Sequence, residues 1–282
     1  MKVNIICPLY NAEHYILNLH KSLLNQEIDC LVNIYYILTE SNDKTEDMLK
    51  DINANYEVIK YHEFSHSLTR ERAAMKCNGD IIVFITQDII IERNDWLKKL
   101  VVPIINKECS ASYSRQLCNN NSIEKYTREN NYPKESRIVS KKDISRLGLN
   151  TFFFSDASSA IDLNVYKALN GYDGKKLPTN EDMYFAYKLI MNGYKIKYCS
   201  DSVIVHSHCF KFRELYRRYY LTGQFFKQND YLDHFGTNSS GLSLAIYIFK
   251  RALFEFNIQA LIEFFPNMIA RYFGMRNGKK HG

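Results

Sequence analysis

In the first 86 residues, four short apolar runs alternate with segments that have the residue spacing of a helix. The runs are VNIIC (3–7), VNIYYIL (32–38), YEVIKY (56–61) and DIIVFIT (80–86). The intervening helices are expected near residues 13–26, 46–53 and 68–77. Apolar strands separated by helices predict a parallel sheet that is buried on both faces. Because such sheets bind ligands at the carboxyl ends of their strands, the residues that follow each strand are the first candidates for a site.

After Trp96 this alternation becomes less regular. Residues 118–148 are polar and rich in Asn, and we interpret them as an excursion over the site. A second block follows, with expected strands at TFFFSD (151–156), YKIKYC (194–199) and SVIVHSH (202–208), an edge strand at SSAIDL (158–163) and a helix over 181–191. From Phe210 onward the pattern favours helices, including the segment 242–273. The chain is therefore expected to fold as an α/β domain followed by a helical extension.

Composition and charge exclude several classes of protein. Lys and Arg number 37 against 31 Asp and Glu, and the resulting charge of +6 makes nucleic acid the weakest candidate partner. The seven Cys form no CxxC pair, which argues against a disulfide framework and favours a reducing cytosol. The apolar segment 242–265 contains four charged residues, so no membrane-spanning helix is expected. The N-terminus resembles no export signal, and no GxxxxGK[ST], GxGxxG or GxSxG motif supports a kinase, dehydrogenase or hydrolase.

Three residues could hold a metal ion. Asp88 closes the strand DIIVFITQD, where its carboxylate could bind a divalent cation together with diphosphate oxygens. An Asp that makes a turn at the end of a strand is the alternative. His206 and His208 are two residues apart, so on an extended segment both rings project to the same face. One or both could bind a metal, although an ordinary pair of histidines is commoner.

Glu181 and Asp182 open the predicted helix over 181–191. Either carboxylate could act as a general base that takes a proton from a hydroxyl nucleophile. The alternative is structural: Asn180 would cap the helix, and the two acids would complement the helix dipole. The residues alone favour this structural interpretation.

Two basic segments are open to more than one interpretation. Arg70 and Arg72 lie near the start of a predicted helix and could pair with a phosphate, although a solvated helix face is the commoner reason for such residues. A later segment interleaves basic and aromatic residues, and it could contact nucleic acid, anionic lipid or a lipid-linked acceptor, or form the outer face of a half-buried helix. Its members are Lys211, Arg213, Tyr216, Arg217, Arg218, Tyr219 and Tyr220.

Taken in order, a series of segments resembles the bacterial rhamnosyltransferase-like branch of the family 2 glycosyltransferases. The segments are CPLYNAE, SLTRERAA before NGDIIVFITQD, SYSRQL, FFFSDASSAI, NEDMYFAYKLIMNGYKIKY and SVIVHSH followed by FRELYRRYYLTGQF. The resemblance extends from about Val3 to Gly274, and its specificity lies in the order of the segments. It implies a GT-A fold, which is Rossmann-like, with a mostly parallel sheet flanked by helices. The catalytic domain would occupy residues 1–209, and a C-terminal helical extension residues 210–282.

The resemblance also implies roles for individual residues. Asp182 would be the general base, and Glu181 would support it. Asp88 would bind Mn or Mg, with His206 as the expected second ligand and His208 as a further candidate. The other implied positions are Pro8, Tyr10 and Glu13 in the loop near the nucleotide, Arg70 at the base pocket and Asp156 near the donor sugar or the acceptor.

The implied reaction is an inverting transfer of a sugar, with L-rhamnose favoured, from a nucleoside diphosphate to a lipid-linked surface polysaccharide at the inner face of the cell membrane. Deoxythymidine-linked rhamnose is the favoured donor, and a uridine-linked hexose is the alternative. Thr86 stands at the first position of the usual DxD motif. Leu38 replaces the acid often found after the second strand, which leaves Glu40 or Asp43 to contact the nucleotide.

These two departures keep a second hypothesis open, in which the chain is a nucleotide-sugar-binding or scaffold protein of the same fold without catalysis. A nucleotidyltransferase is a third hypothesis, because it shares the layered α/β design. Such an enzyme would normally carry a Gly-rich basic loop near its N-terminus to hold phosphates, and CPLYNAE takes that place here.

Overall fold

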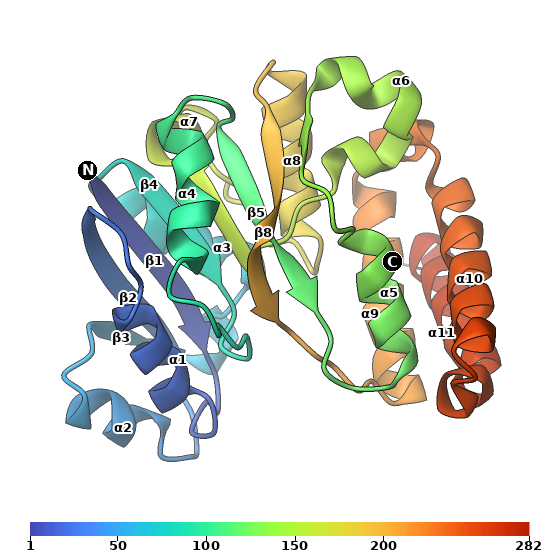
Figure 1. The fold of residues 1–282 in the computed structure, drawn as a ribbon, viewed down its shortest axis with the longest axis horizontal. Coiled ribbons are helices and arrows are strands. Elements are labelled where there is room, and N and C mark those ends of the chain that lie inside the picture. Colours follow the sequence, from blue (N-terminus) through green and yellow to red (C-terminus); the bar gives the residue numbers. More distant parts are fainter. Residues whose placement is uncertain (282) are drawn as a thin grey trace.

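The computed structural model describes residues 1–281, apart from the side chains of residues 237–240. Within this part of the chain, eight strands form one mixed sheet in the order β3-β2-β1-β4-β7-β5-β8-β6 (Figure 1). The strands are β1 Lys2–Leu9, β2 Leu31–Thr39, β3 Tyr56–Ile59, β4 Ile81–Ile85, β5 Ala111–Leu117, β6 Arg137–Val139, β7 Ser158–Asp162 and β8 Ile196–Val205.

Helices flank this sheet and continue beyond it to the C-terminus (Figure 1). The α-helices are α1 Ile16–Leu24, α2 Thr45–Asp51, α3 His66–Lys76, α4 Trp96–Ile105, α5 Ile123–Asn131, α6 Ile144–Leu147, α7 Leu163–Ala168, α8 Glu181–Met191, α9 Phe212–Gln228, α10 Thr237–Phe254 and α11 Ile258–His281. Single 3-10 turns are η1 Tyr61–Glu63, η2 Lys141–Asp143, η3 Gly148–Phe152 and η4 Asp230–Phe235.

The first half of the chain forms the predicted parallel unit. β1 pairs in parallel with β2 and with β4, and Val3 is in register with both Val32 and Ile81. Successive side chains of β1 enter different cores, because a strand directs alternate residues to opposite faces: Ile5 packs in one apolar cluster and Ile6 in the other. Both faces of the sheet are therefore covered, which explains why the apolar runs are continuous.

The second half of the sheet mixes strand directions. β7 lies antiparallel between β4 and β5, β8 runs parallel to β5, and β6 closes the edge antiparallel to β8. The segments YKIKYC and SVIVHSH were expected as two strands, but both belong to the single strand β8. An irregularity in its register with β5, between Ser114 and Arg115, accommodates the polar residues that separate the two apolar runs.

The expected strand at TFFFSD is wrong. Its first two residues end the 3-10 turn η3, and residues 153–157 form a loop that leads into β7. Phe152 is fully buried and packs edge-to-face against Tyr187 of α8 and Phe235 of η4. The aromatic run is therefore apolar because it fills the space between helices, and not because it pairs within the sheet.

The C-terminal helices pack through glycines. Gly223 of α9 faces Gly278 of α11, and a Cβ atom added at Gly278 would overlap the carbonyl oxygen of Tyr220. The absence of side chains lets the two helix backbones lie in direct contact over this stretch. α5, which lies in the polar excursion, packs against α10 and α11 through Ile123 and Tyr126. The excursion thus contains ordered structure that joins the helical layer.

Two other expectations concern the whole chain. All seven Cys are free thiols, as the scattered spacing predicted. Among the described residues, no helix has both the length and the hydropathy needed to cross a bilayer.

Candidate active site

The carboxyl ends of the parallel strands border a cavity of about 730 Å³. Pro8 and Tyr10 reach it from the end of β1, and Asp88 reaches it from the loop after β4. His206 follows β8, and Asp182 lies in the first turn of α8. The opposite wall is formed by α5, α9 and α11, which lie on the far side of the molecule from β1, β2 and β3 in Figure 1. The cavity therefore joins segments from nearly the whole chain.

Gln87 ties the ends of β1 and β4 together. Its Oε1 accepts a hydrogen bond from the backbone N–H of Tyr10 at 2.7 Å, and its Nε2 donates to the carbonyl oxygen of Tyr10 at 2.9 Å. Both backbone groups of Tyr10 are thus held, which fixes the loop after β1 against the loop that carries Asp88. Sequence analysis missed Gln87, and its position beside Asp88 at the end of a strand is the signal that could have identified it.

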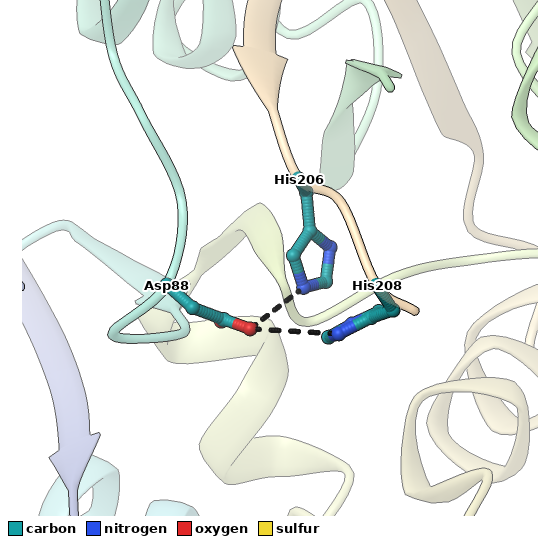
Figure 2. Close-up of side chains that lie close together, drawn as sticks. All are labelled: Asp88, His206 and His208. Carbon is teal, nitrogen blue, oxygen red and sulfur yellow. Dashed lines mark ion pairs between the residues drawn. The ribbon is translucent and has the colours of Figure 1, made fainter. Parts of the chain in front are cut away.

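The structure brings the three candidate metal ligands together (Figure 2). Oδ2 of Asp88 lies 3.4 Å from Nε2 of His206 and 3.8 Å from Nδ1 of His208. One potential ligand atom from each residue lies within 4.8 Å of the others. The other ring nitrogen of His206, Nδ1, lies 2.9 Å from Oε1 of Gln116, a contact that orients the ring toward Asp88.

The charge states of these groups suit a cation. Burial by itself would raise the pKa of Asp88, but its hydrogen bond with His206 and its electrostatic interaction with both imidazole rings outweigh it and hold the pKa below its ordinary value. Burial, together with repulsion from His206, lowers the pKa of His208 to about 3. His208 is therefore neutral near pH 7, which is the form that binds metals. An ionised carboxylate beside two imidazoles is a donor set that fits a divalent first-row metal.

A second cluster of charges surrounds Arg70. Its guanidinium is 3% exposed, and one nitrogen donates both to Oε1 of Glu181 at 3.2 Å and to the carbonyl oxygen of His66 at 3.0 Å. The Nε of Arg70 is buried and has no hydrogen-bond partner in the described part of the chain. Arg70 thus connects α3 to the first turn of α8, directly beside Asp182.

Asp182 lines the cavity, and the pKa of its carboxyl group is shifted from the ordinary value. Burial and the negative charges of Glu181 and Asp156 raise its pKa well above the ordinary value. A hydrogen bond from the backbone N–H of Met183 at 2.8 Å and the charge of Arg70 oppose this shift without cancelling it. A carboxylate with a raised pKa is a stronger base, which is the property that proton abstraction requires.

Asn180 precedes α8 in the left-handed region, at φ 59°, and its side chain makes no capping hydrogen bond. Asn180 therefore holds the N-cap position without a capping bond from its side chain, while Glu181 and Asp182 lie in the first turn, as the structural alternative expected.

Asp156 is buried, and both of its carboxylate oxygens accept hydrogen bonds from other side chains. Its Oδ1 accepts a hydrogen bond from Ser159 at 2.7 Å, and its Oδ2 accepts one from Tyr172 at 2.6 Å. Burial raises its pKa, Arg70 opposes the shift, and Glu181 adds to it. Asp156 also borders the cavity, so its carboxylate contributes charge there while its oxygens hold the surrounding loop.

Glu13, Glu40 and Arg72 do not border this cavity as the described residues define it. Glu13 joins two loops, because its backbone N–H donates to Asp43 and its carboxylate accepts from the backbone of Lys44. Arg72 donates to the carbonyl oxygens of Leu68 and Glu63 near the start of α3, at a position away from the cavity. Glu40 is exposed at the end of β2. The nucleotide contacts expected of Glu13 and Glu40 stay predictions.

Several residues of the helical wall were not identified from the sequence as site residues. Arg128 and Arg271 line the cavity from α5 and α11, next to Thr127. Arg128 donates to Gln116, the residue that orients His206. Arg128 lies in the polar excursion and Arg271 in the last helix, where no local pattern distinguishes them from residues on a solvated face.

Comparison with known proteins defines the class of this fold and site. Residues 4–169 match the model of glycosyl transferase family 2, and the chain belongs to that family. A mannosyltransferase from Pyrobaculum calidifontis, solved in complex with GDP-Man and Mn2+, has a similar fold at 14% identity, with a TM-score of 0.64 over 98% of this chain and 85% of that one. TarS 1-349 of S. aureus, in complex with UDP-GlcNAc, is similar at 14% identity with a TM-score of 0.58, over 99% of this chain and 92% of that one. The expected GT-A fold is confirmed.

More similar sequences narrow the class. The O-antigen chain rhamnosyltransferase RfbN of Salmonella typhimurium is 35% identical over 231 residues, which are 80% of this chain and 72% of that protein. The O-antigen chain rhamnosyltransferase WbaN of Salmonella anatum is 31% identical over 284 residues, which are 98% of this chain and 88% of that protein. The protein described here is thus a family 2 glycosyltransferase, and the resemblance stated from its sequence is confirmed.

Proposed function

We propose that this glycosyltransferase transfers L-rhamnose from a nucleoside diphosphate to a growing surface polysaccharide. The observation that carries the proposal is the similarity to two O-antigen chain rhamnosyltransferases, one of which aligns with 98% of this chain. Deoxythymidine diphosphate rhamnose is the proposed donor, and a uridine diphosphate hexose is the alternative. The acceptor is a glycan carried on a lipid.

In the proposed mechanism, Asp182 accepts the proton of an acceptor hydroxyl. The hydroxyl oxygen attacks the anomeric carbon from the face opposite the leaving diphosphate, so the new glycosidic bond forms as the bond to the diphosphate oxygen breaks. The configuration at the anomeric carbon is inverted in this single step. The raised pKa of Asp182 supports its role as the base, because a general base works best when its pKa lies near the working pH.

The donor's diphosphate would lie next to Asp88, His206 and His208. These residues would hold Mn or Mg, and such an ion supplies positive charge that offsets the charge on a departing diphosphate. Asp88 is anionic and His208 neutral in this arrangement, so both are ready to bind a cation without first losing a proton.

The nucleoside would lie beside Tyr10 and Tyr61, whose ring centroids are 5.7 Å apart. These two rings border a second hollow at the ends of β2 and β3, together with Phe64 and Lys176. Aromatic faces and a cation at the mouth suit a planar base and its attached phosphates.

Release of nucleoside diphosphate from a panel of donors tests this proposal. With lipid-linked acceptor present, we expect release from deoxythymidine diphosphate rhamnose that depends on Mn or Mg and stops with chelator. Release from a uridine diphosphate hexose alone would contradict the rhamnose assignment. Tight donor binding with no release from any donor would favour the scaffold hypothesis instead.

A membrane contact at the cytoplasmic face forms part of the same proposal, because a lipid-linked acceptor lies at a bilayer. The hairpin of α10 and α11 carries a patch of exposed apolar side chains: Leu242, Ile246, Phe249, Leu253, Phe254, Phe256, Ile258, Ile262, Phe265, Ile269, Tyr272 and Phe273. Phe254 and Phe256 are 77% and 84% exposed at its tip. Exposed patches of this extent are rare on surfaces that meet only water.

Charge and position favour a lipid surface over a second copy of the chain as the partner of this patch. Lys250 and Lys280 are exposed on the same two helices, and Lys211 and Arg213 are exposed at the start of α9, which suits anionic headgroups. In Figure 1 the turn between α10 and α11 lies toward the end of the molecule to which β1, β5 and β8 point. Contact there would bring the cavity near the bilayer.

Flotation with phosphatidylglycerol vesicles tests the contact. We expect the wild-type chain to float and the double variant Phe254→Ser and Phe256→Ser to stay at the bottom. Leu31→Ser should float as the control, because Leu31 is also an exposed apolar residue, at 65%, but lies on β2 outside the patch. A wild-type chain that stays at the bottom would rule the contact out. If the wild-type chain forms a dimer and the double variant does not, the patch is the interface with a second copy of the chain.

A further inference from the structure

We propose that Arg218 and Arg271 form a binding site for a phosphate group on the helical wall of the cavity. This wall combines α5, α9 and α11, and it lies across the cavity from the strand ends of β1 and β4. Nothing in the proposed mechanism uses these two arginines. The proposal rests on the burial and hydrogen bonds of Arg271, on the position of Arg218 on the cavity wall and on the distribution of charge around the cavity.

Arg271 is a buried cation without a counter-ion. It is 9% exposed, and its three hydrogen-bond acceptors are neutral: Asn267 at 2.6 Å, the hydroxyl of Tyr219 at 2.7 Å and the hydroxyl of Thr127 at 3.2 Å. No carboxylate of the described residues forms an ion pair with it. A buried guanidinium normally has an anionic partner, because removing a charge from water is costly. Its position on the cavity wall allows a ligand to supply that partner.

Arg218 lines the same cavity from α9. Its guanidinium lies over the ring of Phe210 at 5.3 Å, and Phe210 in turn stacks on His208 at 4.9 Å. Arg218 also forms no ion pair with a carboxylate in the part of the chain that is described. Arg128 differs from both, because its Nε pairs with Glu124 at 3.1 Å. The wall thus presents two positive charges that the protein does not neutralise.

Apart from Glu124, which pairs with Arg128 on α5, the carboxylates that line the cavity lie on the other side. Asp88 lies at the end of β4, and Asp156, Glu181 and Asp182 surround the start of α8. A ligand with a negative group at one end would therefore direct that group toward α9 and α11. A phosphate fits because the planar guanidinium groups of two arginines can each donate two parallel hydrogen bonds to its oxygens.

A phosphate could reach this wall from two sources. One is the diphosphate of the nucleotide donor, and the other is the phosphate that links an acceptor glycan to its lipid. Assignment to either source rests on the proposed function, whereas phosphate binding itself does not.

Equilibrium binding by calorimetry, at one fixed Mg concentration, separates the two sources. Deoxythymidine diphosphate serves as the probe for the donor, and farnesyl diphosphate, added with the nucleotide present, serves as the probe for the lipid carrier. The variants are Arg218→Gln and Arg271→Gln. Their matched controls are Arg217→Gln and Arg276→Gln, which remove the same charge from exposed positions of the same helices that do not border the cavity.

We expect roughly tenfold weaker binding of one probe in each cavity variant and no change in the controls, because a lost charge-assisted contact has about that effect. Weaker binding of the nucleotide assigns the site to the donor, and weaker binding of farnesyl diphosphate assigns it to the acceptor's carrier. Unchanged binding of both probes in Arg218→Gln, an exposed position that the fold does not need, would overturn the proposal. Neither probe contains rhamnose, so a wrong sugar assignment leaves this test intact.

Discussion

Asp182 acquires its chemical character from three neighbours. Glu181 precedes it on α8, Asp156 approaches from the loop before β7, and Arg70 comes from α3. Burial raises the pKa of Asp182 most, the two acids raise it further, and the arginine limits the rise. Because Glu181 is held by Arg70 at 3.2 Å, its charge is fixed in position beside the base. The positions of Glu181, Asp156 and Arg70 therefore influence how strong a base the Asp182 carboxylate is.

Glu181→Gln should move the pH dependence of the reaction. The base must be ionised to accept a proton, so kcat/KM rises as the pH increases through the pKa of Asp182. Removing the negative charge of Glu181 lowers that pKa, and the unpaired Arg70 lowers it further. We therefore expect the acidic limb of the kcat/KM profile to shift to lower pH, while Glu46→Gln on α2 leaves it unchanged. A shift to higher pH would contradict this account of the cluster.

A site residue could be predicted from the sequence when it lies next to a strand or helix that the local residue pattern identifies. Asp88, His206 and Asp182 follow a strand or begin a helix, and elements with clear periodicity fixed their positions at the sheet edge. Arg128 and Arg271 carry no such signal, since their roles depend on contacts with residues far away in the sequence.

At the level of elements, the sequence predicts local periodicity better than strand direction. The first four strands were identified because each apolar run is bounded by a helix. β7 was expected as an edge strand, yet it is inserted antiparallel between β4 and β5 in the middle of the sheet. An apolar run contains no information about the strand it pairs with, and Phe152 shows that aromatic residues can be buried equally well by helices.

The contact between α9 and α11 depends on glycine. Gly278→Ala should destabilise the fold, because the new methyl group would overlap the carbonyl oxygen of Tyr220 and force the helices apart. Overpacking of this kind costs about 1–3 kcal/mol, and we expect a lower melting temperature. Gly241→Ala in α10 is the matched control, since a Cβ atom there would meet no atom within 4 Å. Equal melting temperatures for wild type and Gly278→Ala would show that the contact is not needed.

Across the whole molecule, the cavity depends on segments that are far apart in the chain. Its walls extend from Pro8 at the end of β1 to Arg271 in the last helix. The strand ends of the sheet supply the candidate nucleotide and metal groups, and the helical layer supplies cations and the exposed apolar patch. In the proposed function, a catalytic centre between these two parts would meet a water-soluble donor on one side and a lipid-linked acceptor on the other.

The central claim is that Asp182 is the base of a rhamnosyl transfer, and one comparison tests it most directly. The rate of nucleoside diphosphate release from deoxythymidine diphosphate rhamnose is measured for wild type and Asp182→Asn, with donor affinity determined for both. We expect the variant to bind the donor with unchanged affinity and to lose turnover by roughly 10²–10⁴-fold, the usual contribution of a general base. A variant that turns over at the wild-type rate would contradict the assignment of Asp182 and, with it, the proposed mechanism.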